Sequence, residues 1–309
     1  MKAVRIHQFG GPETLKVEDV AKPEAKATEV LIRILGASVN PVDYKIRKGG
    51  YLGEDALPLT LGRDVAGVVE AVGQGVDEVK AGDAVYALLD RAHGGYAEYV
   101  AEPICNVALK PQTLDFIQAA AVPLAGLTAW QGLIDHGGLT EGQTVLIHGA
   151  AGGVGHFAVQ FAAARGARVI ATCSGDDVEF VTSLGAAEVI DYHKERFEDR
   201  AHDVDLVYDL IGGETQARSF AVIKPGGVIV STLQEPDKAR AAARGIRGAH
   251  YMAAPNGAQL AEIGRLIDAG KVKPTIAGVF PLRQAAAAEQ ELESAHIRGK
   301  LVLEVAKPG

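Results

Sequence analysis

The chain has 309 residues, of which 48% are hydrophobic and 23% are charged, the balance of a globular protein long enough for two domains. A net charge of −8 at pH 7 argues against nucleic acid and anionic membranes as partners, because both attract clustered lysine and arginine. The two cysteines, Cys105 and Cys173, allow at most one disulfide bridge, and the sequence shows neither a secretion signal nor an apolar run of membrane-spanning length. We therefore expect a cytoplasmic protein.

The first 110 residues or so are predicted to form mostly β-structure. Apolar and polar residues alternate there, and turns rich in glycine, proline and aspartate separate the strands. The expected strands are Lys2–His7, Leu15–Val20, Val30–Ala37, Ala66–Val72, Ala84–Ala87 and Tyr96–Val100. A short helix over Val42–Arg47 is expected after Pro41, since proline suits the first position of a helix.

The pattern changes near Pro111, where the chain becomes rich in alanine and strands begin to alternate with helices. The expected helices are Phe116–Ala121, Leu127–Asp135, 154–165, Val178–Leu184, Thr215–Ile223 and Ala258–Ala269. The expected strands are Val145–Ile147, Arg168–Ala171, Glu188–Ile190, Val204–Leu210, Val228–Val230 and Ile246–Met252. This alternation predicts a doubly wound parallel sheet. The last segment, Thr275–Val305, has a strand–helix–strand pattern, and we expect Lys300–Val305 to rejoin the N-terminal β-structure.

The stretch Thr144–His156 has the features of a dinucleotide-binding turn. A short apolar strand is followed by the glycine-rich residues 149–153 and then by a helix. Glycines let the backbone approach a pyrophosphate, and a helix N-terminus offers it free N–H groups and the positive end of a dipole. The alternative is a glycine turn without a ligand. The residues expected to contact a dinucleotide are Ala150, at the first position of the G-x-G-x-x-G pattern, Gly152, Gly153, Val154 and Gly155.

Several further motifs occur in a fixed order along the chain, namely Ala37–Lys45, Gly62–Val69, Gly94–Tyr99, Leu124–Trp130, His148–Gly155, Leu184–Tyr192, Tyr208–Gly213 and Gly299–Leu303. In these motifs the chain resembles the zinc-free medium-chain dehydrogenases/reductases of the quinone or enone reductase kind, over essentially its whole length. The resemblance implies an α/β fold with a GroES-like β domain, residues 1–115 completed by 276–309, and a Rossmann doubly wound parallel-sheet domain, residues 116–275. It also implies an active site between the two domains.

No metal is expected. Zinc-dependent relatives carry a cysteine where this chain has Asn40, and Gly-His-Glu where it has Gly62-Arg63-Asp64. Arginine cannot ligate a cation, and two distant cysteines cannot build a sulfur-rich site. Without a Lewis acid, reduction of an activated acceptor is favoured over alcohol oxidation.

The expected cofactor is NADPH. A Rossmann unit that prefers NAD ends its second strand with an acid that binds the ribose 2′-hydroxyl, whereas this strand ends at Ser174 without one. Ser174 is therefore a candidate donor to a 2′-phosphate. The resemblance adds Tyr192, whose alternative is a half-buried tyrosine at the end of a strand. Asp176 and Asp177 leave an alternative open, because they either cap the next helix or face the ribose and repel a phosphate. Lys300 is expected at the cofactor phosphates, with a surface role as its alternative.

The resemblance points to three candidate catalytic residues. Asn40 is a candidate donor to the developing oxyanion or, alternatively, a helix cap. Lys45 is a candidate oxyanion stabiliser or proton donor, or a solvated lysine. Thr128 matches a position beside the nicotinamide, or is a helix hydroxyl bonded to the chain. Tyr51 is a weaker candidate for the substrate pocket, and Arg63 is expected to be a surface charge.

These features predict a metal-independent oxidoreductase that transfers hydride from NADPH to a quinone or an α,β-unsaturated carbonyl. One alternative is an enal or enone double-bond reductase with little quinone activity, and another is a non-catalytic NADPH-binding sensor. The expected partner is a small-molecule substrate, and the resemblance implies a second copy of the chain as well, joined through an edge strand for which Gly248–Ala254 is the candidate. Both cysteines and His148 are expected to be buried structural residues.

Overall fold

The computed structural model describes residues 1–307, which form two compact units. The first unit comprises Met1–Leu124, Ala254–Gly270 and the C-terminal residues from Pro274. The second comprises Ala125–Ala253 and Lys271–Lys273. No helix within residues 1–307 is both long enough and apolar enough to cross a membrane.

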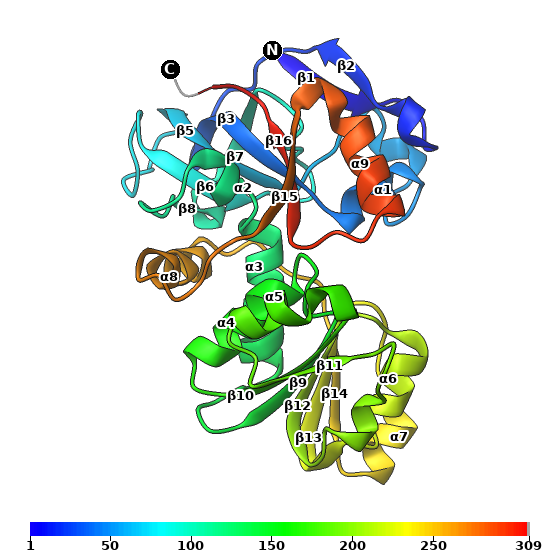
Figure 1. Ribbon diagram of the computed structural model, residues 1–309. Helices are drawn as coiled ribbons and strands as arrows, with labels where there is room; N and C mark the ends of the chain where they lie inside the picture. Colours follow the sequence, from blue (N-terminus) through cyan, green and yellow to red (C-terminus); the bar gives the residue numbers. More distant parts are fainter. Residues whose placement is uncertain (308–309) are drawn as a thin grey trace. The chain divides into compact units, whose positions relative to one another are not determined.

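The first unit is built on a seven-stranded sheet with the order β15-β16-β3-β5-β6-β8, and β7 also pairs with β3 (Figure 1). Its strands are β3 (Glu29–Val39), β5 (Asp64–Val72), β6 (Ala84–Leu88), β7 (Tyr99–Pro103), β8 (Val107–Leu109), β15 (Ile276–Pro281) and β16 (Lys300–Glu304). A three-stranded sheet completes the β-structure with β1 (Lys2–Ile6), β2 (Lys16–Asp19) and β4 (Leu59–Thr60). The C-terminal strand β16 pairs antiparallel with β3, so the prediction that the C-terminus rejoins the N-terminal β-structure is confirmed.

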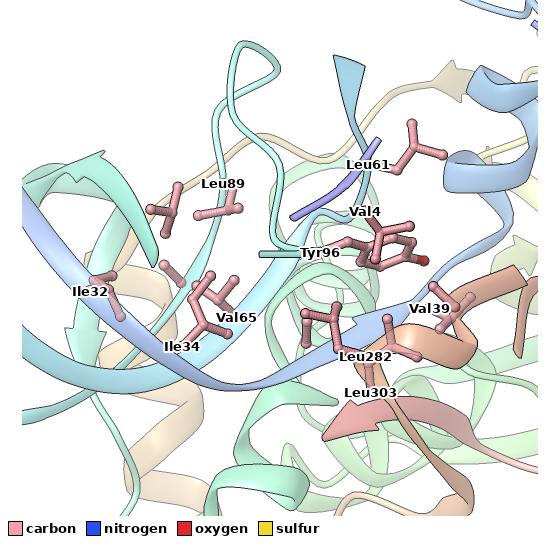
Figure 2. Packing of buried hydrophobic residues seen from close by; sticks show 14 of the residues in the cluster. Val4, Ile32, Ile34, Val39, Leu61, Val65, Leu89, Tyr96, Leu282 and Leu303 are labelled. Carbon is pink, nitrogen blue, oxygen red and sulfur yellow. The ribbon is translucent and has the colours of Figure 1, made fainter. Parts of the chain in front are cut away.

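The helices of the first unit are α1 (Pro41–Arg47), α2 (Phe116–Ala120), α8 (Gly257–Asp268) and α9 (Ala285–Ser294). Helices α1 and α9 contact each other, and buried Arg47 on α1 donates from Nε to Glu289 on α9 at 2.5 Å. The core lies between the sheets and these helices. Figure 2 shows Ile32 and Ile34 of β3 near Val65, and Leu303 near Leu282.

The second unit is a six-stranded sheet with the order β11-β10-β9-β12-β13-β14, in which every pair is parallel. Its strands are β9 (Thr144–His148), β10 (Arg168–Cys173), β11 (Glu188–Asp191), β12 (Val204–Asp209), β13 (Ile223–Ser231) and β14 (Arg247–His250). The helices are α3 (Pro123–Trp130), whose first two residues belong to the first unit, α4 (Gly155–Ala164), α5 (Val178–Ser183), α6 (Gly213–Ser219) and α7 (Lys238–Ala243). Helices flank the sheet on both sides (Figure 1). This is the strand order of a doubly wound dinucleotide-binding fold, with its switch point between β9 and β12.

The observed elements differ from the predicted ones at a few positions. The strand predicted from Tyr96 is β7, which begins at Tyr99. The helix predicted to reach Ile223 ends at Ser219, because Ile223 pairs with Val204 at the start of β13. The helix predicted over Leu127–Asp135 divides into α3 and a π-helical segment, Gln131–His136. The short elements β4, β8 and α7 lack the periodicity that makes longer elements predictable.

Candidate active site

A buried polar group forms where β3 ends and α1 begins, and we call Ser38, Asn40, Asp64 and Lys300 the Asn40 cluster. Asn40 is the N-cap residue of α1 and shares a capping box with Asp43. Register pairing of Leu301 with Val39 brings Lys300, at the start of β16, opposite Asn40. The four members are at most 4% exposed. Buried polar groups of this kind need partners, and the cluster supplies them internally.

The side chains of the Asn40 cluster form a chain of hydrogen bonds. The Lys300 ammonium donates to Asn40 Oδ1 and, at 3.1 Å, to the Val39 carbonyl oxygen. Asn40 Nδ2 donates to Asp64 Oδ2 at 2.8 Å, and the Ser38 hydroxyl donates to the same carboxylate oxygen. The amide of Asn40 therefore lies between a buried cation and a buried anion.

Lys300 and Asp64 offset each other's charge in this buried position. The Lys300 nitrogen lies 4.0 Å from Asp64 Oδ2. Burial lowers the pKa of Lys300, and the nearby carboxylates of Asp64 and Asp43 oppose that change. The surface role considered for Lys300 is wrong, since the side chain is 4% exposed and contacts Asn40.

Asp43 links this region to α9. Asp43 Oδ2 accepts from the Asn40 N–H at 2.8 Å and from the Tyr96 hydroxyl at 3.2 Å. Burial, with the charge of Glu289 nearby, raises the pKa of Asp43 to about 7. Burial likewise raises the pKa of Glu289 to about 7, although Arg47 lowers it. Tyr96 and Glu289 were not predicted as neighbours of Asn40, because no local sequence pattern connects residues so far apart.

The other predicted residues of the first unit lie on α1 and on surface loops. Lys45 is half-buried on α1. Tyr51 is 61% exposed and has a φ of +72°, a left-handed conformation that costs energy for a residue with a side chain. Arg63 is not the expected surface charge, since it is half-buried and donates to the Leu89 carbonyl oxygen at 2.6 Å. Burial lowers the pKa of Arg63.

In the second unit, the glycine-rich turn joins β9 to α4 at the switch point of the sheet. A Cβ atom on Gly155 would lie 2.1 Å from the Gly149 carbonyl oxygen, so this position requires glycine for packing. A Cβ on Gly152 would meet only that same oxygen, at 3.5 Å, and otherwise open space within the described structure. Ala150 and Gly155 are buried, whereas Gly152, Gly153 and Val154 are half-buried.

This turn fits the pyrophosphate of a dinucleotide. The half-buried backbone from Gly152 to Val154 leads directly into α4. The Gly152 N–H donates to the Gly149 carbonyl oxygen at 3.2 Å and the His156 N–H donates to the Gly152 carbonyl oxygen at 3.0 Å, so the anion would be bound by the N–H groups between these two. Backbone N–H groups and a helix dipole together favour an anion. The open space beside Gly152 lets such an anion approach the backbone. Of the five residues predicted here, Ala150 and Gly155 shape the turn, and the other three offer the accessible backbone.

Ser174 and Tyr192 lie at one edge of the sheet. Register pairing of Cys173 with Asp191 places the ends of β10 and β11 side by side, and Ser174 and Tyr192 are the next residues. Tyr192 is 54% exposed. Lys194 contributes a cation to this edge, with its nitrogen 3.1 Å from Asp191 Oδ2. Lys194 was not predicted, because it follows the third strand of this unit, β11, and not the second, where the residue that selects between NAD and NADP is expected.

Asp177 is the N-cap residue of α5, as one of the two interpretations required. Within residues 1–307, however, its side chain makes no capping hydrogen bond. The capping role assigned to this side chain is therefore wrong in its detail, although its position is right.

The carbonyl oxygen of Thr128 accepts hydrogen bonds from two buried tyrosines. The Tyr208 hydroxyl donates to it at 3.0 Å, the Tyr251 hydroxyl also donates to it, and the two phenol oxygens lie 2.7 Å apart. Burial raises the pKa of both phenols, which keeps them neutral donors. The π-helical segment begins three residues after Thr128, and such segments are common at functional sites. Thr128 itself is 8% exposed.

The remaining residues considered in the sequence are His148 and the two cysteines. His148 is fully buried between the hydroxyls of Thr172 and Ser219, and burial lowers its pKa to about 4, so it is a neutral structural residue, as predicted. Cys173 is buried, but Cys105 is exposed, which corrects the prediction that both thiols are buried. In residues 1–307, His, Cys, Asp and Glu side chains form no group of three or more that could hold a metal ion.

Residues 26–112 match the alcohol dehydrogenase GroES-like domain, and residues 184–303 match the zinc-binding dehydrogenase family. The NADPH-dependent alkenal/one oxidoreductase of Arabidopsis thaliana chloroplasts is 39% identical, over 98% of this chain and 79% of the relative.

Solved structures show the same similarity. The quinone oxidoreductase of Coxiella burnetii superposes with a TM-score of 0.91 at 37% identity, covering 99% of each chain. The Escherichia coli quinone oxidoreductase, solved as a complex with NADPH, superposes with a TM-score of 0.89 at 29% identity, over 99% of this chain and all of the other. These similarities agree with the sequence motifs, with the GroES-like first unit and with the Rossmann sheet of the second unit. The chain belongs to the zinc-free quinone and enone oxidoreductases of the medium-chain dehydrogenase/reductase family.

Proposed function

We propose that this chain is an NADPH-dependent oxidoreductase that transfers hydride to a quinone or an α,β-unsaturated carbonyl. The observation that carries the proposal is the half-buried turn from Gly152 to Val154, at the switch point of a sheet with dinucleotide-binding strand order. The named activities of the Arabidopsis and Coxiella relatives supply the two acceptor classes.

The second unit is proposed to bind the cofactor and the first to bind the substrate. The backbone of Gly152, Gly153 and Val154 would hold the pyrophosphate. Ser174 and Tyr192 would hold the 2′-phosphate, and their place on one edge of the sheet supports this role. The E. coli structure with NADPH supports the choice of cofactor.

Bound NADPH would supply the hydride, and the acceptor oxygen would then gain negative charge. We assign stabilisation of this charge to the Asn40 amide and to the half-buried Lys45, which also has a proton to donate. Thr128, held by two tyrosines, would support the nicotinamide. The exposed Tyr51 is assigned to the substrate pocket.

We further propose a homodimer and a cytoplasmic location. Strand β14 ends the order of the parallel sheet, so its outer edge is available to pair with a second copy. Neither Cys105 nor Cys173 forms a disulfide, which supports a reducing compartment, and the net charge of −8 argues against nucleic-acid or membrane partners. Light scattering of the purified protein would measure the mass, and a monomer at all concentrations would contradict the dimer.

The proposed activity is tested by following NADPH absorbance with an ortho-quinone and, separately, with a medium-chain enone. Turnover with either acceptor, faster with NADPH than with NADH, is the expected result. Turnover of the enone alone would favour the double-bond reductase alternative. NADPH binding without consumption of either acceptor would refute the proposal and favour a cofactor-sensing protein.

A further inference from the structure

The Asn40 amide has a defined orientation because its two neighbours have opposite hydrogen-bonding chemistry. An ammonium can only donate, and an ionised carboxylate can only accept. Lys300 must therefore face the amide oxygen, and Asp64 must face the amide nitrogen, as the structure shows. If both neighbours were groups that donate and accept hydrogen bonds, either orientation of the amide would be satisfied, because its oxygen and nitrogen ends have nearly the same shape.

From this arrangement we propose that Lys300 is a positioning residue for the reaction, which fixes and polarises the Asn40 amide from the side away from Asp64. The inference rests on the proposed function, in which Asn40 stabilises the acceptor oxygen. One N–H of Nδ2 is directed to Asp64 at 2.8 Å, whereas the contacts of Nδ2 with Ser38 are long, at 3.4 Å. The second N–H therefore has only these long, weak contacts with Ser38, and we assign it to the acceptor oxygen.

The ammonium also changes how strongly Asn40 donates. A cation bonded to an amide oxygen draws electron density from the nitrogen, and hydrogen bonds in a buried chain strengthen one another. Lys300 is 4% exposed, so water does not screen this effect. The cluster thereby brings positive charge to the position where zinc-dependent relatives carry their metal ligands, without placing the lysine itself on the substrate.

The test compares Lys300→Met and Lys300→Arg with the matched control Lys110→Met. Lys110 lies in the same unit and also donates to a backbone carbonyl, that of Pro111 at 2.8 Å, but it lies outside the Asn40 cluster. With Lys300→Met, kcat should fall roughly 10- to 100-fold, the loss expected when a group that orients a catalytic side chain is removed. The KM for NADPH should change little, Lys300→Arg should recover part of the loss, and Lys110→Met should match the wild type.

A spectroscopic measurement reads the orientation of Asn40 directly. The chain has only three asparagines, at positions 40, 106 and 256, so asparagine-selective 15N labelling gives three side-chain amide signals. Lys300→Met should shift the Asn40 signal and leave the other two in place, and Lys110→Met should shift none of the three. This measurement does not depend on catalytic activity. If the wild type shows no activity, the proposed function is refuted, but the amide signal still tests whether Lys300 orients Asn40.

Three results would overturn the inference. These are an unchanged kcat with Lys300→Met, a raised KM for NADPH at constant kcat, which would place Lys300 on the cofactor, and an Asn40 signal that does not move. If Lys300→Met does not fold, an alkaline titration of the wild type replaces it. The Asn40 signal should then shift when the ammonium loses its proton beside Asp64 of β5 and Asp43 of α1, and a constant signal in folded protein would refute the role.

Discussion

Replacing Asp43 with asparagine should stabilise the protein at neutral and alkaline pH. Asp43 is fully buried, and both of its donors, the Asn40 N–H at 2.8 Å and the Tyr96 hydroxyl at 3.2 Å, bind the same oxygen, Oδ2. The other oxygen, Oδ1, is buried without a hydrogen-bond partner among residues 1–307. An asparagine whose carbonyl oxygen takes the place of Oδ2 keeps both hydrogen bonds and carries no charge.

The magnitude follows from the pKa of Asp43, which burial and the charge of Glu289 raise from 3.8 to about 7. The unfolded chain releases this proton near the lower value and the folded protein near the higher one, so stability falls as the pH rises between them. The full difference is about 4 kcal/mol, because each pKa unit corresponds to 1.36 kcal/mol. On the order of 3 kcal/mol of it falls between pH 5 and pH 8.

Urea denaturation of the wild type and of Asp43→Asn, at pH 5, 6, 7 and 8, measures this effect. The stability of the variant relative to the wild type should rise steadily with pH, and Asp77→Asn, at an exposed position, should follow the wild type throughout. Glu289 has a raised pKa of its own, so the difference between the two proteins is the decisive quantity. A difference that stays constant from pH 5 to pH 8 would refute the reasoning.

Three further predictions concern other parts of the chain. Gly155→Ala should lower the free energy of unfolding by about 1–3 kcal/mol, because the new Cβ would lie 2.1 Å from a carbonyl oxygen, whereas Gly152→Ala should unfold like the wild type but bind NADPH more weakly in a fluorescence titration. Equal stability of the two variants would contradict this. The hydrogen bond with Glu102 raises the pKa of His93, so its ion pair stabilises the fold at low pH and is lost as the pH rises through that raised pKa. His93→Gln should therefore cost up to about 1 kcal/mol at pH 6 and almost nothing at pH 9 in thermal denaturation, and a cost independent of pH would be the contrary result. Lys194→Met should raise the KM for NADPH more than that for NADH, and equal changes would remove Lys194 from 2′-phosphate recognition.

Much of the fold could be predicted because its long elements repeat a strong local pattern. The strand and helix on either side of the glycine turn, and the alternation that follows, were expected from apolar periodicity and turn residues, and the six-stranded parallel sheet confirms them. The π-helical segment Gln131–His136 was not predictable in this way. Its apolar spacing is that of an ordinary helix, and the tyrosines that bind the Thr128 carbonyl come from β12 and from the residues after β14.

By itself, the sequence determined the fold class, the family and the turn at which a dinucleotide would bind, since each depends on residues that are neighbours in the chain. It also singled out Asn40 as the residue at a metal ligand's position. The tertiary structure decided which groups surround Asn40. Lys300 lies 260 residues away along the chain, and Asp43 is joined through Tyr96 to the region of Glu289 on α9. Pairing of β16 with β3 and packing of α9 on α1 create these contacts, and burial then sets the charges, which no local pattern encodes.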